Sequence, residues 1–260
     1  MGRGMIPEKP RAALEYGVNT MLELPIKNRA GQYCVAPSKI IALGQNYRDH
    51  IAERDKVGVG SFDAHIPSEP ILFAVTPNAL LGPGEAIMLP AFVHDYGFDR
   101  VRTHYEAELA FFIGTRCRRV SEADALSHIF GYTCANDVSQ RNIQGLDKSG
   151  WFRAKSLDTF CPIGPCVTRA EDIDPRALRI QCRLNGRVVQ DGNTRDMIFT
   201  IPEMIAFISK QITLEPGDLI LTGTPAGVGE LAHGDTVEVE IEGIGALSNR
   251  VVDERIANAS

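Results

Sequence analysis

The chain has 260 residues, of which 44% are hydrophobic and 23% charged, a balance that argues against a disordered chain and predicts a full hydrophobic core. Its formal net charge is −6 and it has no Lys/Arg run, so a nucleic-acid-binding surface is not expected. No apolar run approaches the roughly 18 residues that a membrane-spanning helix needs, which leaves small molecules and proteins as partners.

We expect residues 1–37 to form a small N-terminal appendage and residues 38–255 to form the main domain. Within the appendage, residues 11–16 have a short helical pattern and residues 21–25 that of a strand. Residues 1–27 lack the apolar core of a signal peptide, and the six cysteines form no C-x-x-C pair. These features predict a cytoplasmic protein with reduced, buried thiols.

The main domain begins with an apolar run, residues 39–43, that predicts a buried strand. Asn46 then stands where it can cap a short helix, with Asp49 at the third helical position. In that helix His50 and Glu53 are three residues apart and share a face. Such a pair is commonly an exposed salt bridge. It also suits acid–base chemistry, because histidine titrates near neutral pH and a carboxylate one turn away can fix its tautomer.

The rest of the chain reads mainly as short strands and turns. Residues 54–61 are charged, contain glycine and have no period, which predicts a mobile loop. We predict strands at residues 71–75, 86–89 and 236–241, and helices at residues 121–130 and, after a capping box, 200–210. Few helices and no β-α-β rhythm predict an α+β fold built from antiparallel or mixed sheets. No glycine-rich nucleotide loop follows a strand, which argues against a nicotinamide or flavin site.

The central feature is the stretch 104–114, whose β-branched and aromatic residues predict a strand. Because side chains alternate along a strand, Glu106 and Glu108 project from the same face. Residues 109–113 are apolar on both faces, so we expect covering layers on both sides. Two carboxylates about 4 Å apart repel by roughly 4 kcal/mol at an effective dielectric of about 20, so they need a proton, a cation or water. A hard cation such as Mg²⁺, Mn²⁺ or Ca²⁺ suits oxygen-only ligands.

Three other segments carry polar groups that can join these carboxylates. Asp137 follows a predicted strand, residues 131–136, although an Asn-Asp pair at a strand end is also typical of a turn. Lys155 lies among aromatic residues; lysine is usually exposed, but an inward lysine would balance the carboxylates and hold a substrate's negative charge. Residues 222–227 are typical of either a plain tight turn or one that cradles an anion with hydroxyls and backbone N–H groups.

Together these segments resemble the fumarylacetoacetate hydrolase family over residues 38–252. The resemblance rests on five blocks that occur in the same order. They are Gly44-x-Asn46-Tyr47-x-x-His50-x-x-Glu53, Tyr105-Glu106-Ala107-Glu108-Leu109, Gly131-Tyr132-Thr133-x-x-Asn136-Asp137-Val138-Ser139, Lys155-Ser156-x-Asp158-Thr159-Phe160-x-Pro162-x-Gly164-Pro165 and Thr222-Gly223-Thr224-Pro225-x-Gly227-Val228-Gly229.

The resemblance implies an α+β fold with a β-rich, mixed-sheet roll and few short helices, usually a homodimer that binds Mg²⁺ or Mn²⁺. It also implies roles for individual residues. These are Glu106, Glu108 and Asp137 as metal ligands, Lys155 as the active-site lysine, His50 with Glu53 as an acid–base dyad on a lid, and Arg141, Gln144, Gly223 and Thr224 as substrate contacts.

Two positions depart from the family pattern. Asn142 stands where aspartate is common, and we expect it to alter hydrogen bonds behind the site. Val75 stands where a lysine often follows the strand that contains Phe73, and we expect it to reshape the pocket. The second departure weakens any prediction of the substrate.

Members of such a family act on 2-oxo or 2,4-dioxo acids, with a metal that stabilises an enolate. We predict hydrolytic C–C cleavage of an acylpyruvate or fumarylpyruvate, in which Glu53 orients His50, His50 activates water, and the metal and Lys155 hold the leaving pyruvate enolate. The alternatives are isomerisation of 2-hydroxyhepta-2,4-diene-1,7-dioate, which the ending 243–252 also resembles, and decarboxylation of oxaloacetate. A non-catalytic, metal-dependent binder of keto acids is a further alternative.

Overall fold

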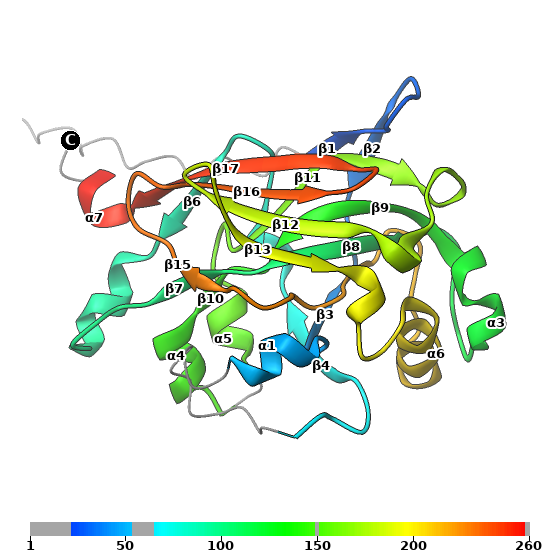
Figure 1. Ribbon diagram of the computed structural model, residues 1–260, viewed down its shortest axis with the longest axis horizontal. Coiled ribbons are helices and arrows are strands. Elements are labelled where there is room, and N and C mark those ends of the chain that lie inside the picture. Colours follow the sequence, from blue (N-terminus) through cyan, green and yellow to red (C-terminus); the bar gives the residue numbers. More distant parts are fainter. Residues whose placement is uncertain (1–21, 54–64, 149–150, 258–260) are drawn as a thin grey trace, which may run out of the picture.

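The computed structural model describes residues 22–53, 65–148 and 151–257, which form stacked β-sheets with a few short helices (Figure 1). This confirms the predicted α+β, β-rich, mixed-sheet fold. The helix predicted at residues 11–16 and the loop predicted at residues 54–61 lie outside the described residues. The division into an appendage and a main domain stays a prediction.

Two large sheets make up most of the described chain. The seven-stranded sheet has the order β4 (Ile71–Val75), β3 (Ile40–Gly44), β14 (Leu219–Leu221), β8 (Ala107–Ile113), β9 (Ile129–Asn136), β11 (Cys161–Arg169) and β5 (Leu80–Leu81). The five-stranded sheet has the order β13 (Arg187–Asn193), β12 (Arg179–Leu184), β16 (Thr236–Ile241), β17 (Gly245–Asp253) and β6 (Ala86–Leu89). Antiparallel pairs dominate, but β3–β14, β5–β11 and β6–β17 are parallel.

Two smaller sheets complete the β-structure. One joins β10 (Ser139–Gln140), β7 (Thr103–Tyr105) and β15 (Gly229–Glu230), and the other joins β1 (Leu22–Pro25) to β2 (Gln32–Val35). The strand predicted over residues 104–114 is therefore interrupted at Glu106, with β7 and β8 in different sheets. The interruption matters because it frees the backbone of Glu106 for other partners.

The core lies on both faces of β8, as its apolar sequence predicts. Leu109, Phe111 and Ile113 pack between the two large sheets, against residues of β12, β16 and β17. Ala110 and Phe112 face the opposite side, where they join residues of β1 to β4 and β14. Burying each large apolar side chain contributes about 1.5–3 kcal/mol, so β8 is held firmly in place. Glu106 and Glu108 share parity with Ala110 and Phe112, which places them on that second face.

The helices are short and gather in two places (Figure 1). α6 (Ile201–Gln211) has the predicted capping box between Thr200 and Glu203 and lies beside α3 (Glu122–Ala125). The helix predicted to reach residue 130 is wrong at its end, because Ile129 already pairs with Ile113 as the start of β9. α1 (Arg48–Ala52), α4 (Arg141–Leu146) and α5 (Phe152–Lys155) lie together on one side of the strands, and α7 (Glu254–Ala257) follows β17.

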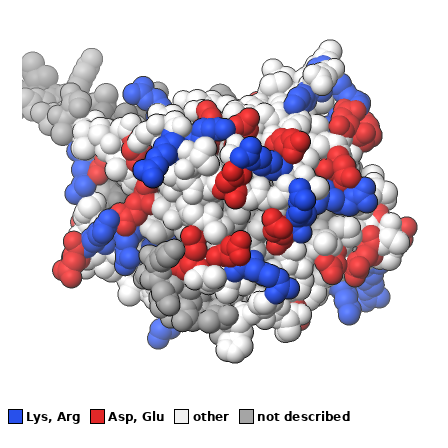
Figure 2. All heavy atoms as spheres, in the orientation of Figure 1, with Lys and Arg blue, Asp and Glu red and all other residues white. Residues whose placement is uncertain are grey.

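Acidic and basic side chains are interspersed over the face shown in Figure 2. Several form ion pairs across strands of the five-stranded sheet, as Arg179 does with Asp191 and Arg183 with Glu238. All six cysteines are free thiols; four are buried, whereas Cys34 is exposed and Cys166 half-buried, so the predicted burial holds for four. Among the helices that the structure describes, the longest has 11 residues, and none is long and apolar enough to cross a membrane.

Candidate functional site

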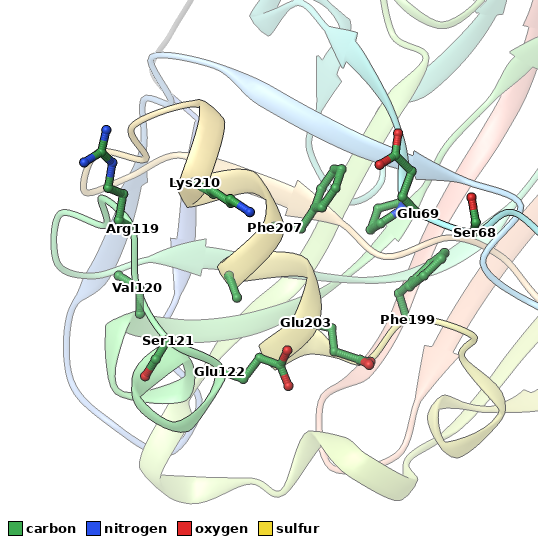
Figure 3. A pocket seen from close by; sticks show the side chains of 12 residues that line it. Ser68, Glu69, Arg119, Val120, Ser121, Glu122, Phe199, Glu203, Phe207 and Lys210 are labelled. Carbon is green, nitrogen blue, oxygen red and sulfur yellow. The ribbon is translucent and has the colours of Figure 1, made fainter.

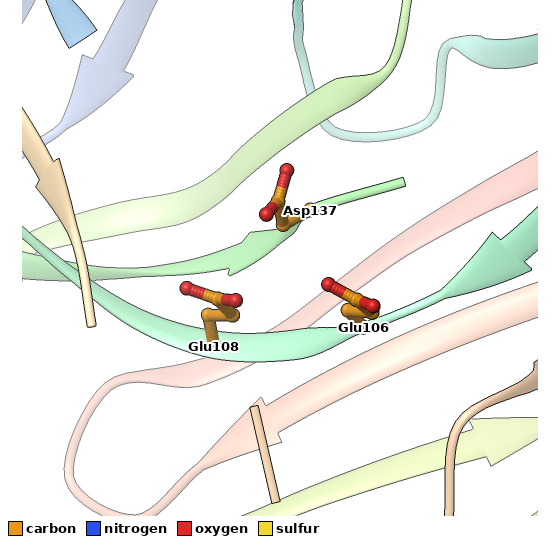
Figure 4. A group of neighbouring side chains, drawn as sticks. All are labelled: Glu106, Glu108 and Asp137. Atoms are coloured by element: carbon orange, nitrogen blue, oxygen red, sulfur yellow. The ribbon is translucent and has the colours of Figure 1, made fainter. Parts of the chain in front are cut away.

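Three buried carboxylates converge where β8 starts and β9 ends (Figure 4). Glu106, Glu108 and Asp137 each offer an oxygen, and these oxygens lie within 4.8 Å of one another. Their side chains come from two separate segments, yet they lie next to one another in Figure 4. The structure thus brings together the three residues predicted to hold a metal.

Strand pairing explains why these carboxylates meet. Ala107 is the register partner of Asn136, so Glu106 and Asp137 flank the same point of the ladder. Where β7 and β8 separate, the Glu106 N–H donates to Asn136 Oδ1 at 2.9 Å, and the Glu106 carbonyl accepts from Asp137 N at 2.9 Å. Asn136 therefore fixes the break that points Glu106 into the site. The Asn136-Asp137 pair, whose sequence is also typical of a turn, thus forms the hydrogen bonds that fix this break.

Two cations lie among the carboxylates. Lys155 Nζ donates at 2.6 Å to Glu106 Oε2 and at 2.6 Å to Asp137 Oδ2, and its side chain is 3% exposed. Arg141 binds Glu106 Oε1 and also donates to Gln144 Oε1 at 2.9 Å. Lys155 is the last residue of α5 and one of its two buried residues, and Trp151 precedes this helix with a φ of +68°. Lys155 Nζ also lies 5.4 Å from the centre of the Phe73 ring.

The pKa values show that these two cations do not fully balance the negative charge of the three carboxylates. Burial alone would raise the pKa of Glu106, but Arg141 and Lys155 hold it well below its usual range. For Glu108, burial together with Asp137 and Glu106 holds the pKa well above its usual range. Burial also raises the pKa of Asp137 to about 6, although Lys155 opposes the rise. Glu108 and Asp137 therefore retain a demand for positive charge.

The donor set fits a hard divalent cation. All three ligands are carboxylates, the ligands that Mg²⁺ and Mn²⁺ prefer. Asp137 Oδ1 is buried and has no hydrogen-bond partner among the described residues, so one oxygen is available to a cation. The cavity beside these groups has a volume of about 20 Å³, enough for about one ion or water molecule.

Most of the predicted site residues line this cavity. They are His50, Glu106, Glu108, Asp137, Arg141, Gln144, Lys155 and Thr224. Thr224 Oγ1 accepts from Gln190 Nε2 at 2.9 Å, which leaves its own hydroxyl proton to donate. Gly223 is placed differently, because its N–H donates to Glu108 Oε2 at 2.7 Å and so holds a predicted metal ligand. A φ of +92° lets this glycine turn its N–H inward.

His50 and Glu53 are not hydrogen-bonded to each other. His50 lines the cavity, and its Nδ1 is buried without a partner among the described residues. Glu53 Oε2 instead accepts from Gly227 N at 2.6 Å. The role of the pair as a dyad stays a prediction. Burial lowers the pKa of His50 to about 4, so the ring is neutral near pH 7.

The predicted cap of the helix that carries His50 is wrong. Tyr47 occupies the N-cap position of α1, and its side chain makes no capping hydrogen bond. Asn46 instead donates to Thr222 O at 2.8 Å, and its Oδ1 accepts from Phe199 N at 2.8 Å. Long-range backbone partners have displaced the local cap, because the buried amide can satisfy both of its ends there.

Neither of the two departures from the family pattern lines the cavity, so the expectation that Val75 reshapes it is not met. Asn142 Oδ1 accepts from Arg102 N at 2.8 Å and its Nδ2 donates to Arg100 O at 2.8 Å. An aspartate could not make the second bond. Val75 is buried in the core and does not line the cavity, whereas Phe73 on the same strand does.

Trp151 and Phe73 line the cavity, although the sequence reasoning gave neither a site role. Their rings meet edge to face at 5.3 Å. Gly44 makes room for the indole, since a Cβ there would lie 2.4 Å from a Trp151 ring carbon. In the sequence, the only indication of this packing is Gly44, the glycine that follows the apolar run of β3.

A larger hollow of about 860 Å³ lies over α6 (Figure 3). It is open, and its lining includes Phe199, Phe207, Glu203 and Lys210. None of the predicted site residues lines it. We therefore place the functional site at the smaller cavity, where the buried charges lie.

The family, the relatives and the solved structures that match this chain agree with one another. Residues 39–252 match the family described as fumarylacetoacetate (FAA) hydrolase C-terminal. A mitochondrial oxaloacetate tautomerase from Xenopus laevis is 41% identical over 244 residues, which are 90% of this chain and 69% of that protein. A 2-hydroxyhepta-2,4-diene-1,7-dioate isomerase from Mycobacterium marinum is 41% identical, with a TM-score of 0.72 over 85% of this chain and 77% of that one. A fumarylacetoacetate hydrolase from Exiguobacterium antarcticum is 38% identical, with a TM-score of 0.71 over 85% and 77%.

Proposed function

Because the chain belongs to the fumarylacetoacetate hydrolase family, we propose that it is a divalent-metal-dependent enzyme acting on 2-oxo acids, and that it hydrolyses a C–C bond in a 2,4-dioxo acid of the acylpyruvate type. The observation that carries the proposal is the buried convergence of Glu106, Glu108 and Asp137 beside two cations and His50. Mg²⁺ or Mn²⁺ bound to the three carboxylates would polarise the carboxylate and keto oxygens of such an acid.

The remaining groups suit the binding of an anionic substrate. Arg141 Nε is buried and has no partner among the described residues, so it can donate to a substrate carboxylate. Thr224 can donate its hydroxyl proton to another oxygen. Lys155, whose pKa is raised by Asp137 and Glu106 against the effect of burial, stays charged and can hold the negative charge of a departing enolate.

His50 is the group that moves a proton. A neutral imidazole that lines the cavity can accept a proton from water, and the hydroxide so formed attacks the distal carbonyl of the 2,4-dioxo acid. The C–C bond then breaks, and pyruvate leaves as its enolate. Changing His50→Ala should abolish turnover while metal and oxalate binding persist, whereas an unmodified protein that binds oxalate and turns over nothing would favour a non-catalytic binder.

A second candidate is isomerisation or keto–enol tautomerisation. The relatives named as an isomerase and as a tautomerase favour it, since they match 85% and 90% of this chain. The same residues would then carry a proton between two carbons of the acid, or between carbon and oxygen, and no water would be consumed. Decarboxylation of oxaloacetate would need the same cation and loss of CO₂.

One assay separates these reactions. Purified protein with Mg²⁺ is given acetylpyruvate, fumarylpyruvate, oxaloacetate and 2-hydroxyhepta-2,4-diene-1,7-dioate, and products are identified by NMR. Pyruvate plus a second carboxylic acid from an acylpyruvate supports hydrolysis. A rearranged acid of unchanged composition supports the second candidate. No turnover of any acylpyruvate would overturn the hydrolase proposal.

We also propose that the protein is a homodimer. Light scattering of the protein as it elutes from a size-exclusion column measures its molar mass and so tests this proposal.

A further inference from the structure

A separate cavity of about 200 Å³ lies at the end of the molecule where α7 follows β17, beside β6 (Figure 1). It shares no lining residue with the cavity beside the three carboxylates. Its volume is below the roughly 300–1,000 Å³ of pockets that hold drug-sized ligands, so it suits a small molecule. The proposed function gives this second cavity no role.

One wall of this cavity is an ion pair with a fixed geometry. Arg255 Nε donates to Asp253 Oδ1 at 3.1 Å, and Arg255 Nη2 donates to Asp253 Oδ2 at 2.7 Å. The backbone N–H of Arg255 also donates to Oδ1, at 2.9 Å. These hydrogen bonds hold the pKa of Asp253 below its usual value, so the carboxylate stays ionised and cannot donate. Both of its oxygens are already occupied by N–H groups of Arg255.

Two histidines that line the cavity accept hydrogen bonds at Nδ1. The backbone N–H of Asp253 donates to His233 Nδ1 at 3.2 Å. Arg255 Nη1 lies 3.3 Å from His94 Nδ1, and a guanidinium group can only donate. A ring that accepts at Nδ1 carries its proton on Nε2. Each histidine therefore offers an Nε2–H donor, and no described residue accepts from either of them.

The side-chain groups that remain available in the cavity are mainly donors. Asp253 and His94 use only part of the Arg255 fork, so guanidinium N–H groups remain beside the two imidazole Nε2–H groups. Such a set favours a ligand that accepts hydrogen bonds, above all an anion. It does not favour a zinc ion, which would need the lone pair of Nε2 in place of its proton and would lie beside the positive charge of Arg255.

We propose that this cavity binds a small organic anion, whose carboxylate or phosphate oxygens accept hydrogen bonds from His94, His233 and Arg255. The rest of the lining includes the apolar side chains of Leu89 and Leu231, which suit a short apolar part of the same molecule. The site is independent of the proposed function, because none of its residues belongs to the carboxylate cavity. It can therefore be tested whether or not the protein cleaves an acylpyruvate.

The test follows the imidazole signals of the Mg²⁺-loaded protein by NMR while inorganic phosphate or isobutyrate is added at constant ionic strength. The signals of His94 and His233 should shift and reach saturation. Those of His128 should not, because this histidine lies outside the cavity and its Nδ1 is 2.9 Å from Thr115 Oγ1. Tighter binding of isobutyrate would identify the ligand as a carboxylic acid with an apolar part, and tighter binding of phosphate would identify a molecule that carries a phosphate group.

Two variants locate the binding. His94→Phe and His233→Phe keep an aromatic ring and remove the Nε2–H donor, so each should weaken anion binding about tenfold or more. His128→Phe should bind the anion as wild type does. The proposal is overturned if neither anion gives a saturable shift at His94 and His233, if both substitutions leave the affinity unchanged, or if Zn²⁺ binds there and neither anion does. The wild-type titration decides the matter even where a variant fails to fold.

Discussion

At the scale of single residues, the site is a buried cluster of three carboxylates and two cations. Lys155 and Arg141 both bind Glu106, whereas Glu108 receives one backbone N–H, from Gly223. Isolated charges are costly to bury, so each member of the cluster depends on the others. Changing one member should therefore show which charge the rest of the cluster needs.

We expect Lys155→Met to destabilise the protein by about 3–5 kcal/mol, because it leaves Glu106 and Asp137 without their shared cation. Added Mg²⁺ should then raise the melting temperature more in this variant than in wild type, since the metal becomes the replacement charge. Thermal unfolding with and without Mg²⁺ measures both effects. Lys39→Met, which breaks an ion pair with Asp218 away from the site, is the control. An equal response to Mg²⁺ in the two variants would refute the metal assignment.

The lowered pKa of His50 makes stability depend on pH. The unfolded histidine titrates near 6.5, whereas burial brings the folded pKa to about 4. Between these values the unfolded chain binds a proton that the folded chain does not, so stability falls as pH drops from about 6.5 to 4 and levels off below. The loss amounts to about 3 kcal/mol. The free energy of unfolding of His50→Gln should therefore fall less than that of wild type between pH 7 and pH 4.5. Urea unfolding without divalent ions measures this. Identical losses in the variant and in wild type would contradict the prediction.

At the scale of elements, the register of β8 against β9 sets the carboxylates, while β3 shapes the cavity wall. Gly44, at the end of β3, lies against the ring of Trp151, which packs on Phe73 of β4. The atoms nearest to Gly44 belong to the end of the Trp151 side chain, which can move aside more easily than backbone atoms could. The wall can therefore be altered without disturbing the strand.

Gly44→Ala should displace the Trp151 ring and cost about 1–3 kcal/mol, because a Cβ would lie 2.4 Å from a ring carbon. The chain has a single tryptophan, so its emission spectrum reports the displacement directly. Gly145→Ala in α4 is the control, since nothing lies within 4 Å of a Cβ there. A wild-type emission spectrum in Gly44→Ala would show that the ring does not occupy this place.

At the scale of the whole molecule, the two large sheets share one core, and β8 belongs to it along its length. The residues of β8 that face the five-stranded sheet are fully buried, and their neighbours on the strand include Glu108, a predicted metal ligand. Core packing and site geometry are therefore parts of one cooperative structure. A substitution that destabilises the core should therefore also destabilise the site, and both should unfold in one transition.

Leu109→Ala should lower the free energy of unfolding by about 2–5 kcal/mol, because the leucine is fully buried between the sheets. Far-UV circular dichroism, which follows the sheets, and Trp151 fluorescence, which follows the site, should give coincident denaturant transitions. Val188→Ala, at an exposed position, should change stability by no more than about 0.5 kcal/mol. Separate transitions would show that the site unfolds independently of the core.

Much of this fold follows from local pattern in the sequence. The strands at residues 71–75, 86–89 and 236–241 and the capping box of α6 lie where predicted, because apolar runs, alternation and capping depend on neighbouring residues. The same local rule placed Glu106 and Glu108 on one face. α4 and α5 were not predicted, since helices of six and four residues leave almost no periodic signal.

By itself, then, the sequence determined several of the strands, the burial of β8 on both faces and the pair of carboxylates on one of those faces, because each of these follows from residues that are neighbours along the chain. Only the tertiary structure decided that β7 and β8 part at Glu106, that Asn46 binds Thr222 and Phe199 in place of capping α1, and that Glu53 binds Gly227 and not His50. Each of these outcomes pairs a polar group with a partner far along the chain, and the folded backbone determines which partner is within reach.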